Sequence, residues 1–295
     1  MARPIAALLE RYRVTDGRKF RLKKIKPGDT GGLASEIEDE AKGLLADGTQ
    51  RLYEQQAKLY AEDRWSVLLI FQAMDAAGKD GTIKHVMSGV DPTGTIVTSF
   101  KQPSTEELDH DFLWRCAKAL PERGRIGIFN RSYYEEALIV RVHPEILERQ
   151  QLPAKLVTKS IWKERFEDMR NFELHLSRNG VLVIKFFLHL SKKEQKKRFL
   201  ARLEEKEKNW KFSLADAEER TYWKQYQAAY EDAIRNTATP YAPWYVVPAD
   251  NKWFTRLVVA EAIAEGIAGL RSEFPKLDAA KLRELAKARA ALLRE

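Results

Sequence analysis

Residues 65–82 read WSVLLIFQAMDAAGKDGT, an apolar run that ends in a turn of small residues containing Gly78 and Lys79. The continuous apolar stretch at 66–71 is typical of a strand that is covered on both faces of a sheet. A helix is expected to follow from about Gly81 to Ser88. In such a strand–turn–helix unit, backbone N–H groups and the helix N-terminus face an anion, and a lysine adds positive charge. The stretch therefore predicts a phosphate-binding loop.

The loop departs from the pattern G-x-x-x-x-G-K-[ST] at two places. Ala73 stands where the first glycine is expected, and Asp80 follows Lys79 where a hydroxyl residue is expected. A tight turn with an incidental lysine is the alternative. Asp75 is a candidate Mg²⁺ ligand, because a carboxylate inside a phosphate loop repels phosphate unless it holds a cation. Asp80 is expected to cap the following helix. The predicted phosphate contacts are Ala77, Gly78, Lys79, Asp80, Gly81 and Thr82.

Further strands and helices alternate along the chain, which predicts an α/β three-layer sandwich with a mainly parallel five-stranded sheet. Ligands of such sheets lie at the carboxyl ends of the strands. The segments that follow Phe71, Phe129 and Leu190 should therefore meet at one edge. The expected strands are 66–71, 95–100, 125–129, 181–190 and 244–247, and the expected helices are 34–62, 110–120, 155–178, 192–207, 214–235 and 252–271. The predicted organisation is one domain, 1–295, with a basic N-terminal arm at about 1–30, a helical lid at about 191–235 and a helical tail at about 273–295.

The segment after Phe129 reads NRSYYEE, at residues 130–136. Arg131 suits bidentate phosphate binding, unless it pairs with an acid such as Glu135. Ser132 is expected to cap the next helix, with Glu135 at the capping-box position.

Residues 192–211 carry nine Lys or Arg and four Glu. Arg198 and Arg202 are four residues apart and share a helical face. A solvated charged face is one explanation of this run, and a lid that closes over phosphates is the other. Lys208 and Lys211 lie near the tip of such a lid, and are expected to contact phosphates with the two arginines.

The 295-residue chain has a net charge of +8 and a pI of about 9.3, which indicates a polyanionic partner or simple solubility. No apolar run approaches the roughly 20 residues of a membrane span. The start lacks the features of a signal peptide, and the single cysteine fits a reducing cytoplasm. The five histidines show no spacing typical of a metal site.

Four stretches together resemble the second family of polyphosphate kinases, which are P-loop kinase-like phosphotransferases, over about residues 10–272. They are DAAGKDG (75–81), FNRSYYEE (129–136), SKKEQKKRFLARLEEKEKNWKFS (191–213) and APWYVVPADNKWFTR (242–256). The resemblance implies transfer of phosphoryl groups between inorganic polyphosphate and adenine nucleotides, with guanine nucleotides as further candidates. It also implies Mg²⁺, which Mn²⁺ could replace, a helical lid and a homodimer or homotetramer in the cytoplasm, with no membrane or nucleic-acid partner.

By that resemblance, Asp75 and Lys79 belong to the Walker A loop, Asn130 and Arg131 to the Walker B region, and Arg198 and Arg202 to the lid. The expected catalytic residues are Asp75, Lys79, Asn130 and Arg131. Much of the family has aspartate where Asn130 stands, and the asparagine followed by YYEE resembles the subgroup that phosphorylates both AMP and ADP. Glu136 is then the candidate for the missing metal carboxylate beside Asp75. The expected nucleotide contacts are Asn130, Glu135 and Glu136.

Two other functions remain open from the residues alone. The first is an ATP-dependent nucleoside monophosphate kinase, which would share the loop and the lid. The second is a non-enzymatic nucleic-acid binder that uses residues 11–26 and 192–211. Such binders interleave exposed aromatic residues with basic ones, whereas Phe20 and Trp210 are the few candidates here.

Overall fold

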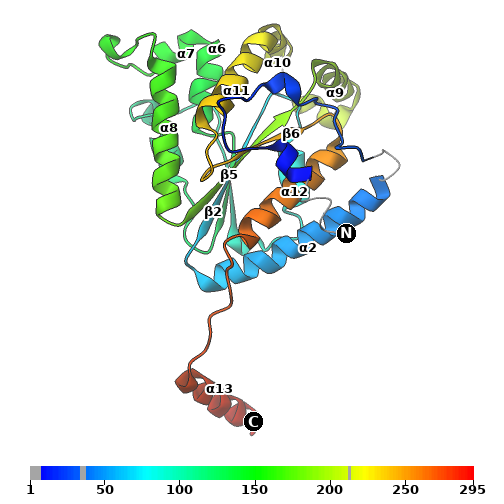
Figure 1. Cartoon of the computed structure of the whole chain (residues 1–295), viewed down its shortest axis with the longest axis vertical. Helices are drawn as coiled ribbons and strands as arrows, with labels where there is room; N and C mark the ends of the chain where they lie inside the picture. Colours follow the sequence, from blue (N-terminus) through cyan, green and yellow to red (C-terminus); the bar gives the residue numbers. More distant parts are fainter. Residues whose placement is uncertain (1–7, 34–37, 212–213) are drawn as a thin grey trace.

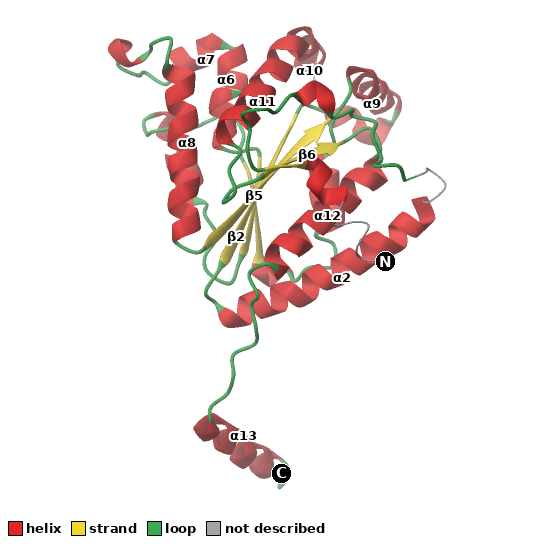
Figure 2. Cartoon of the chain, viewed as in Figure 1, coloured by secondary structure: helices red, strands yellow, loops and turns green. Residues whose placement is uncertain are grey.

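The computed structural model describes residues 8–33, 38–211 and 214–295, which form an α/β sandwich around one sheet (Figures 1 and 2). The strands lie in the order β1-β6-β5-β2-β4-β3. Every neighbouring pair is parallel except β1 with β6. Their bounds are β1 (Arg13–Val14), β2 (Ser66–Ala73), β3 (Thr95–Ser99), β4 (Ile126–Asn130), β5 (Val181–His189) and β6 (Trp244–Pro248).

The predicted fold class and all five predicted strands are confirmed, but the predicted strand number is one too low. The additional strand, β1, lies in the segment that was expected to be an extended arm. Its two residues pair antiparallel with β6, Arg13 opposite Tyr245 and Val14 opposite Trp244. Two residues are too few to produce an alternating pattern in the sequence, so the strand is fixed by its neighbour instead.

Strand β2 lies inside the sheet and is buried along its whole length. Val67, Leu69 and Phe71 belong to one hydrophobic core, and Leu68 and Ile70 belong to the other. Because successive side chains of a strand point to opposite faces, the apolar run supplies both cores at once. The sandwich therefore has three layers, as predicted.

Helices cover both faces of the sheet (Figure 1). The core on one face contains residues of α2 (Glu38–Glu62), α3 (Lys79–Val86) and α12 (Lys252–Ala268). The core on the other face contains residues of α8 (Ile161–Arg178), α11 (Trp223–Thr237) and the 3-10 helix η4 (Tyr133–Ala137).

The remaining helices are short or lie at the margins of the sandwich. They are α4 (Thr105–Leu108), α5 (Trp114–Lys118), α6 (Ile139–Val142), α7 (Pro144–Glu148), α9 (Lys192–Glu204), α10 (Leu214–Glu218) and α13 (Ala279–Leu292), with the 3-10 helices η1 (Leu22–Lys24), η3 (Pro92–Gly94), η5 (Ala154–Leu156), η6 (Lys206–Lys211) and η7 (Glu219–Tyr222). Helix α13 lies apart from the sandwich at the end of an extended segment, and its side chains are exposed (Figure 1). No described helix is both long enough and apolar enough to cross a membrane.

The end of the segment expected to form the lid belongs to the sandwich instead. Helix α11 buries Ala229, Tyr230, Ala233 and Ile234 in the core that it shares with α8. These residues recur at helical spacing, so one face of α11 is committed to the sheet. Of the segment predicted to form a lid, only the part from α9 to η7 is therefore left for that role.

Candidate active site

The phosphate-loop candidate connects β2 to α3 at the carboxyl edge of the sheet. Gly78 is the N-cap residue of α3 and has φ of 96°, a left-handed conformation that favours glycine. Ala76 also has a positive φ, 61°. Such residues cluster at functional sites because the surrounding structure must hold them in place. The loop is thus a tightly specified turn whose backbone leads into a helix N-terminus.

The Lys79 side chain folds back over this loop. Its Nζ donates to the carbonyl oxygen of Ala73 at 3.0 Å. Burial, and after it the positive charge of Arg131, lower the pKa of the Lys79 ammonium. The two cations thus lie close enough to affect each other, a repulsion that an anion between them would relieve.

Asp80 does not cap α3, contrary to the sequence prediction. The N-cap is Gly78, which makes no side-chain cap hydrogen bond, and Asp80 lies in the first turn. Its Oδ1 instead accepts from Nδ2 of Asn130 at 2.7 Å. The carboxylate remains favourably placed near the positive end of the helix dipole. This contact joins the loop after β2 to the end of β4.

Arg131 lies between two acids at the ligand edge. It therefore pairs with acids and is also placed to bind phosphate, the two roles considered from the sequence. Its Nη2 is 3.5 Å from Oδ1 of Asp75, and its Nη1 is 4.0 Å from Oε2 of Glu135. Glu135 is the first cause of a raised Arg131 pKa. Arg131 also has φ of 66°, while its N–H donates to the Phe71 carbonyl oxygen. An unfavourable backbone conformation thus directs this guanidinium to the ligand edge.

Ser132 caps η4 as predicted, by accepting from the N–H of Tyr134 at 3.1 Å. Glu135 faces Arg131, and no capping-box contact with Ser132 is found among the described residues.

A buried polar cluster fixes the segment that carries Arg131 and Glu135. Nζ of Lys185 donates to Oε2 of Glu173 at 2.6 Å and to the Tyr134 hydroxyl oxygen at 3.0 Å. The hydroxyls of Tyr133 and Tyr134 both donate to Oε1 of Glu173, at 2.9 and 2.8 Å. Lys185 and Glu173 are completely buried. Hence the backbone at 130–136 is attached to β5 and α8 through the two tyrosines.

Arg198 holds the loop from its outer side. Its Nη1 donates to the carbonyl oxygens of Ala76 and Ala77 at 3.1 and 3.0 Å. Its Nη2 donates to those of Ala249 and Asp250, and its Nε donates to Glu194. A guanidinium has five N–H donors, and all five are used here. The arginine predicted to bind phosphate is therefore engaged in joining three segments of the protein.

The predicted loop, strand-end and lid residues line one open cleft of about 890 Å³. The cleft brings together these predicted residues: Asp75, Ala77, Gly78, Lys79, Asp80, Gly81, Thr82, Asn130, Arg131, Arg198 and Arg202. Lys101, Lys252 and Arg256 line it too, and sequence reasoning named none of them. Lys252 and Arg256 follow the carboxyl end of β6, so the rule used for the other strands would have found them.

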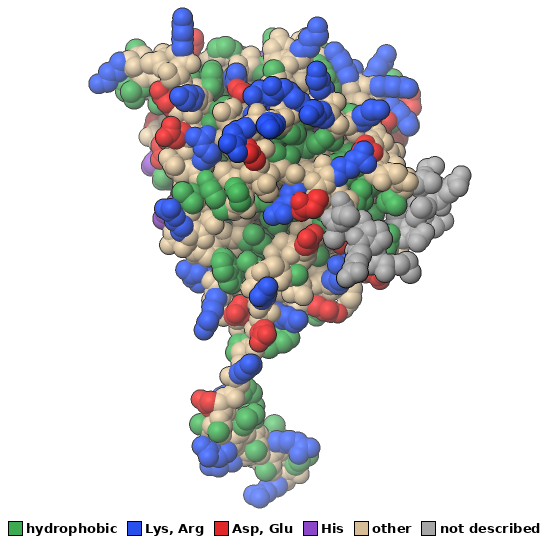
Figure 3. Space-filling model, viewed as in Figure 1, with side chains coloured by type: hydrophobic (Ala, Val, Ile, Leu, Met, Phe, Trp, Pro, Cys, Tyr) green, Lys and Arg blue, Asp and Glu red, His purple; other side chains and the backbone are tan. Residues whose placement is uncertain are grey.

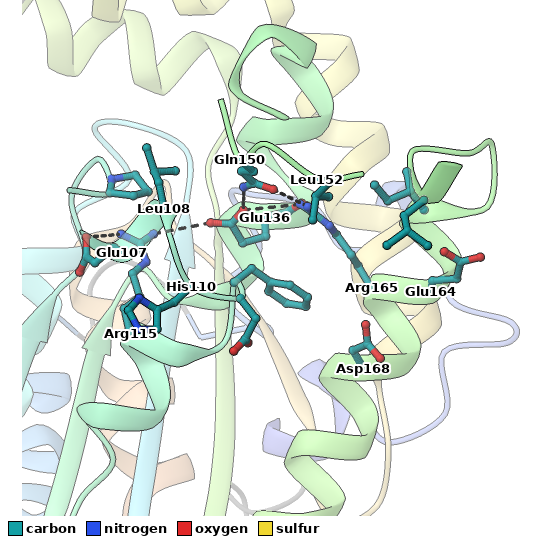
Figure 4. Close-up of a pocket in the computed structure, with 15 residues that line it drawn as sticks. Glu107, Leu108, His110, Arg115, Glu136, Gln150, Leu152, Glu164, Arg165 and Asp168 are labelled. Atoms are coloured by element: carbon teal, nitrogen blue, oxygen red, sulfur yellow. Dashed lines mark hydrogen bonds and ion pairs between the residues drawn. The ribbon is translucent and has the colours of Figure 1, made fainter. Parts of the chain in front are cut away.

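Two of the predicted residues fall outside the described side chains, and two others do not line the cleft: Glu135, which faces Arg131, and Glu136. Lys208 and Lys211 belong to η6, but their side chains lie outside the described part of the chain. Glu136 lines a separate pocket of about 230 Å³ between the 103–115 segment and α8 (Figure 4).

Glu136 is enclosed by cations in that pocket (Figure 4). Its carboxylate lies 3.7 Å from Arg115 and 3.5 Å from Arg165, and it accepts from Gln150 at 2.5 Å. Burial raises the pKa of Glu136, although the two arginines act to lower it. A carboxylate so paired serves the packing of this pocket, so the structure does not support Glu136 as a metal ligand beside Asp75.

The cleft nevertheless suits Mg²⁺. Asp75 and Asp80 provide carboxylates, Thr82 a hydroxyl and Asn130 an amide oxygen, all of them hard oxygen donors. Among the residues that the structure describes, no three acidic or metal-binding side chains form a cluster. Mg²⁺ commonly binds through one or two carboxylates and completes its shell with substrate phosphates and water. The donors present fit that mode.

We expect Arg198→Ala to damage the loop itself. Removing a charged donor from several carbonyl oxygens should cost about 2–3 kcal/mol of unfolding free energy and lower kcat/KM for both substrates. Arg202→Ala is the control, because no hydrogen bond from Arg202 to the loop is found among the described residues; its effect should be confined to the polyanionic substrate. Thermal unfolding and kinetics of both variants would check this. Equal behaviour of the two variants would contradict it.

Comparisons with known proteins agree with this geometry. The family model for polyphosphate kinase 2 (PPK2) matches residues 35–275. The chain is 51% identical over 290 residues to the ADP-polyphosphate phosphotransferase of Rhodopseudomonas palustris, covering 97% of this chain and 98% of that protein. It is 42% identical over 276 residues to the AMP/ADP-polyphosphate phosphotransferase of Meiothermus ruber, covering 92% and 97%.

The crystal structure of polyphosphate kinase 2 from Arthrobacter aurescens TC1 superposes with a TM-score of 0.85 at 39% identity, covering 96% of each chain. The family match spans the loop, the β4 end and α9, the same elements that form the cleft. From its sequence, its fold and its cleft, this chain belongs to the polyphosphate kinase 2 family.

Proposed function

We propose that this protein transfers the terminal phosphoryl group of inorganic polyphosphate to ADP and to AMP. The observation that carries the proposal is the single cleft in which the β2–α3 loop, Arg131 and further cations meet. Membership of the polyphosphate kinase 2 family and the names of the two relatives support it. A substrate with many charges and no bases requires only such a cationic cleft.

The chemistry needs positioning and charge neutralisation more than covalent help. A terminal phosphate oxygen of the acceptor attacks the terminal phosphorus of the polymer. A new P–O bond forms, the P–O bond to the next phosphate breaks, and the shortened polymer leaves with the bonding electrons. Lys79 and Arg131 are placed to neutralise the developing charge on the transferring group. No strong base is required, since the acceptor oxygen is already ionised near neutral pH.

Mg²⁺, or Mn²⁺ in its place, belongs to the proposal as the ion that neutralises phosphate charge when bound. Asp75 and Asp80 are the carboxylates that would hold it, with the side-chain oxygen of Asn130 beside them. Asp75 could also orient the attacking oxygen of the acceptor.

For the acceptor, the proposal rests on Asn130 and Glu135 at the end of β4. Both relatives carry ADP in their names, and the one from Meiothermus ruber carries AMP as well. Glu136 acts behind them, where its pairing with Arg165 holds the following turn. Guanine nucleotides remain further candidates for the same site.

We predict that Asn130→Asp changes the choice between AMP and ADP. The amide that donates to Asp80 would become a second carboxylate at hydrogen-bond distance. Repulsion between the two carboxylates would move one of them away or favour the binding of a cation between them. The ratio of kcat/KM for AMP to that for ADP should shift about tenfold, roughly 1.4 kcal/mol. Asn171→Asp, an exposed position on α8, serves as the control. An unchanged ratio would show that Asn130 does not set the acceptor.

One experiment tests the proposed activity directly. The protein is incubated with Mg²⁺, long-chain polyphosphate and either AMP or ADP, with no nucleoside triphosphate, and the nucleotides are then separated. We expect ATP from ADP, and ADP followed by ATP from AMP. Turnover with ATP as the donor but none with polyphosphate would favour a nucleoside monophosphate kinase. No conversion by folded protein would remove the proposal.

The oligomeric state and the cellular location of the protein are proposed from the family resemblance alone. We expect a homodimer or homotetramer in the cytoplasm, and light scattering of the purified protein would measure its mass in solution.

A further inference from the structure

The basic arm lies at the ligand edge, although the proposed chemistry does not use it. Residues 17–28 run from the C-terminal part of α11 to the loop after β6. The N–H of Leu22 donates to Oε2 of Glu231 at 2.8 Å, and the carbonyl oxygen of Pro27 accepts from the N–H of Asp250 at 3.1 Å. Nδ2 of Asn251 donates to the Gly28 carbonyl oxygen. The arm is therefore attached to the sandwich at both ends.

The arm is held by buried groups while its lysines face solvent. Leu22 is buried, and Ile25 packs against both hydrophobic cores. Lys23, Lys24 and Lys26 are exposed, and no hydrogen bond or ion pair of their side chains is found among the described residues. The three ammonium groups therefore stay in water when the arm packs against the sandwich, and their charges remain available to a ligand.

The nearby acids are already engaged. Asp29 accepts from Tyr12 and pairs with Arg11, both at 3.0 Å. Glu231 accepts from Leu22, and Asp250 accepts from the N–H of Ser191 at 2.8 Å. The side chains of the arm therefore add net positive charge to this edge. Figure 3 shows the result, since lysine and arginine side chains gather over the region where Figure 1 shows the arm crossing in front of α11 toward α9.

Hydrogen bonds link the arm to the wall of the cleft. Asp250 joins the arm to the start of α9 through Pro27 and Ser191, and its carbonyl oxygen accepts from Arg198, which also holds the phosphate loop. Lys252, two residues further on, lines the cleft itself. A chain of phosphates leaving the cleft on this side would meet the arm lysines next.

We propose that Lys23, Lys24 and Lys26 form a distal subsite that binds polyphosphate residues beyond those held in the cleft. This inference rests on the proposed function for its ligand, because it takes polyphosphate to be what the cleft binds. The cleft then selects the terminal phosphates, and the arm adds affinity only for polymers long enough to reach it. Single-stranded nucleic acid fits less well, because Phe20, the aromatic residue of this segment, is partly buried and packs against a hydrophobic core.

The test compares donors of two lengths. In the triple variant Lys23→Ala/Lys24→Ala/Lys26→Ala, kcat/KM for long-chain polyphosphate should fall about tenfold, and the slope of log(kcat/KM) against log[salt] should flatten by about two units. Tripolyphosphate has only three phosphates, which the cleft itself is proposed to hold, and the triple variant should use it as well as the wild type does. The matched control removes the same charge from α13, as Arg283→Ala/Lys287→Ala/Arg289→Ala, and should behave as wild type. Replacing the three arm lysines with arginine should preserve activity.

Direct binding separates this inference from the proposed activity. Fluorescence anisotropy of labelled long-chain polyphosphate requires no turnover, and the triple alanine variant should bind it more weakly than the α13 control. If the wild type binds but turns over no polyphosphate, the proposed function fails while the subsite stands. Equal binding by the two variants, an equal loss with tripolyphosphate, or loss of RNA binding alone would overturn the subsite.

Discussion

Lys79→Ala should lower kcat/KM by two to three orders of magnitude or more, roughly 3–5 kcal/mol of transition-state stabilisation. The ammonium lies against the backbone of the loop, at 3.0 Å from the Ala73 carbonyl oxygen. It shares the cleft with Arg131 and the N-terminus of α3, where phosphate charge must be neutralised. No other lysine of α3 can replace it, since Lys84 lies in the last turn of this helix.

Steady-state kinetics with polyphosphate and ADP would measure this loss, and Lys84→Ala provides the matched control on the same helix. Lys84 is exposed, so its removal should change neither activity nor unfolding. The Lys79 variant should also unfold near the wild-type temperature, because its side chain belongs to a loop contact rather than to a hydrophobic core. Near-normal activity of folded Lys79→Ala would mean that the loop is only a turn.

The lowered pKa of Lys79 adds a pH dependence with a definite sign. Burial and Arg131 favour the neutral amine, so the ammonium of the free enzyme loses its proton at a lower pH than an ordinary lysine. If its charge is needed for binding the donor, kcat/KM should decline on the alkaline side, and saturation with the anionic substrate should move this decline to higher pH.

Lys185→Met should lower the free energy of unfolding by about 3–5 kcal/mol, because it leaves Glu173 charged and buried without its cation. The methionine fills a similar volume, so the loss is electrostatic rather than a cavity. Chemical denaturation would measure it. Lys163→Met, at an exposed position of α8, removes the same charge and should change stability by less than about 0.5 kcal/mol.

A double variant separates the ion pair from packing. Lys185→Met/Glu173→Leu replaces both partners with apolar groups and should recover part of the loss, although the hydroxyls of Tyr133 and Tyr134 then lose their acceptor. If the single variant is as stable as the Lys163 control, the cluster contributes nothing measurable. Because the tyrosines follow Arg131, we also expect reduced activity in the folded fraction of the single variant.

Much of the ligand edge was predictable because parallel strands place their carboxyl ends together. The apolar runs of β2, β4 and β5 were long enough to identify, and the loop, Arg131 and α9 followed from them. The adjacent glutamates show where this reasoning ends. Glu135 faces Arg131 and Glu136 faces Arg115 and Arg165, and only the conformation of η4 decides which acid pairs with the arginine of the cleft.

Contacts between segments distant in sequence account for the other differences. Arg198 was expected to bind phosphate because it shares a helix face with Arg202, but its partners are backbone carbonyls about 50 and 120 residues away, which no local pattern reveals. Lys185 within the apolar run VLVIKFFLHL was a signal of a buried ion pair, yet its partner Glu173 could not be chosen among the many acids of α8.

The hydrogen bonds of Arg198 also limit where the segment that begins with α9 can bend. Helix α9 is tied through this residue to the β2–α3 loop and to the backbone after β6, so it cannot swing outward as a rigid lever without releasing both. If a lid closes over the cleft, as the resemblance predicts, its movement must originate further along the chain, beyond Arg198, where Leu200 and Leu203 are already exposed. The first two turns of α9 belong to the fixed frame of the enzyme, and any lid over the cleft begins where those hydrogen bonds end.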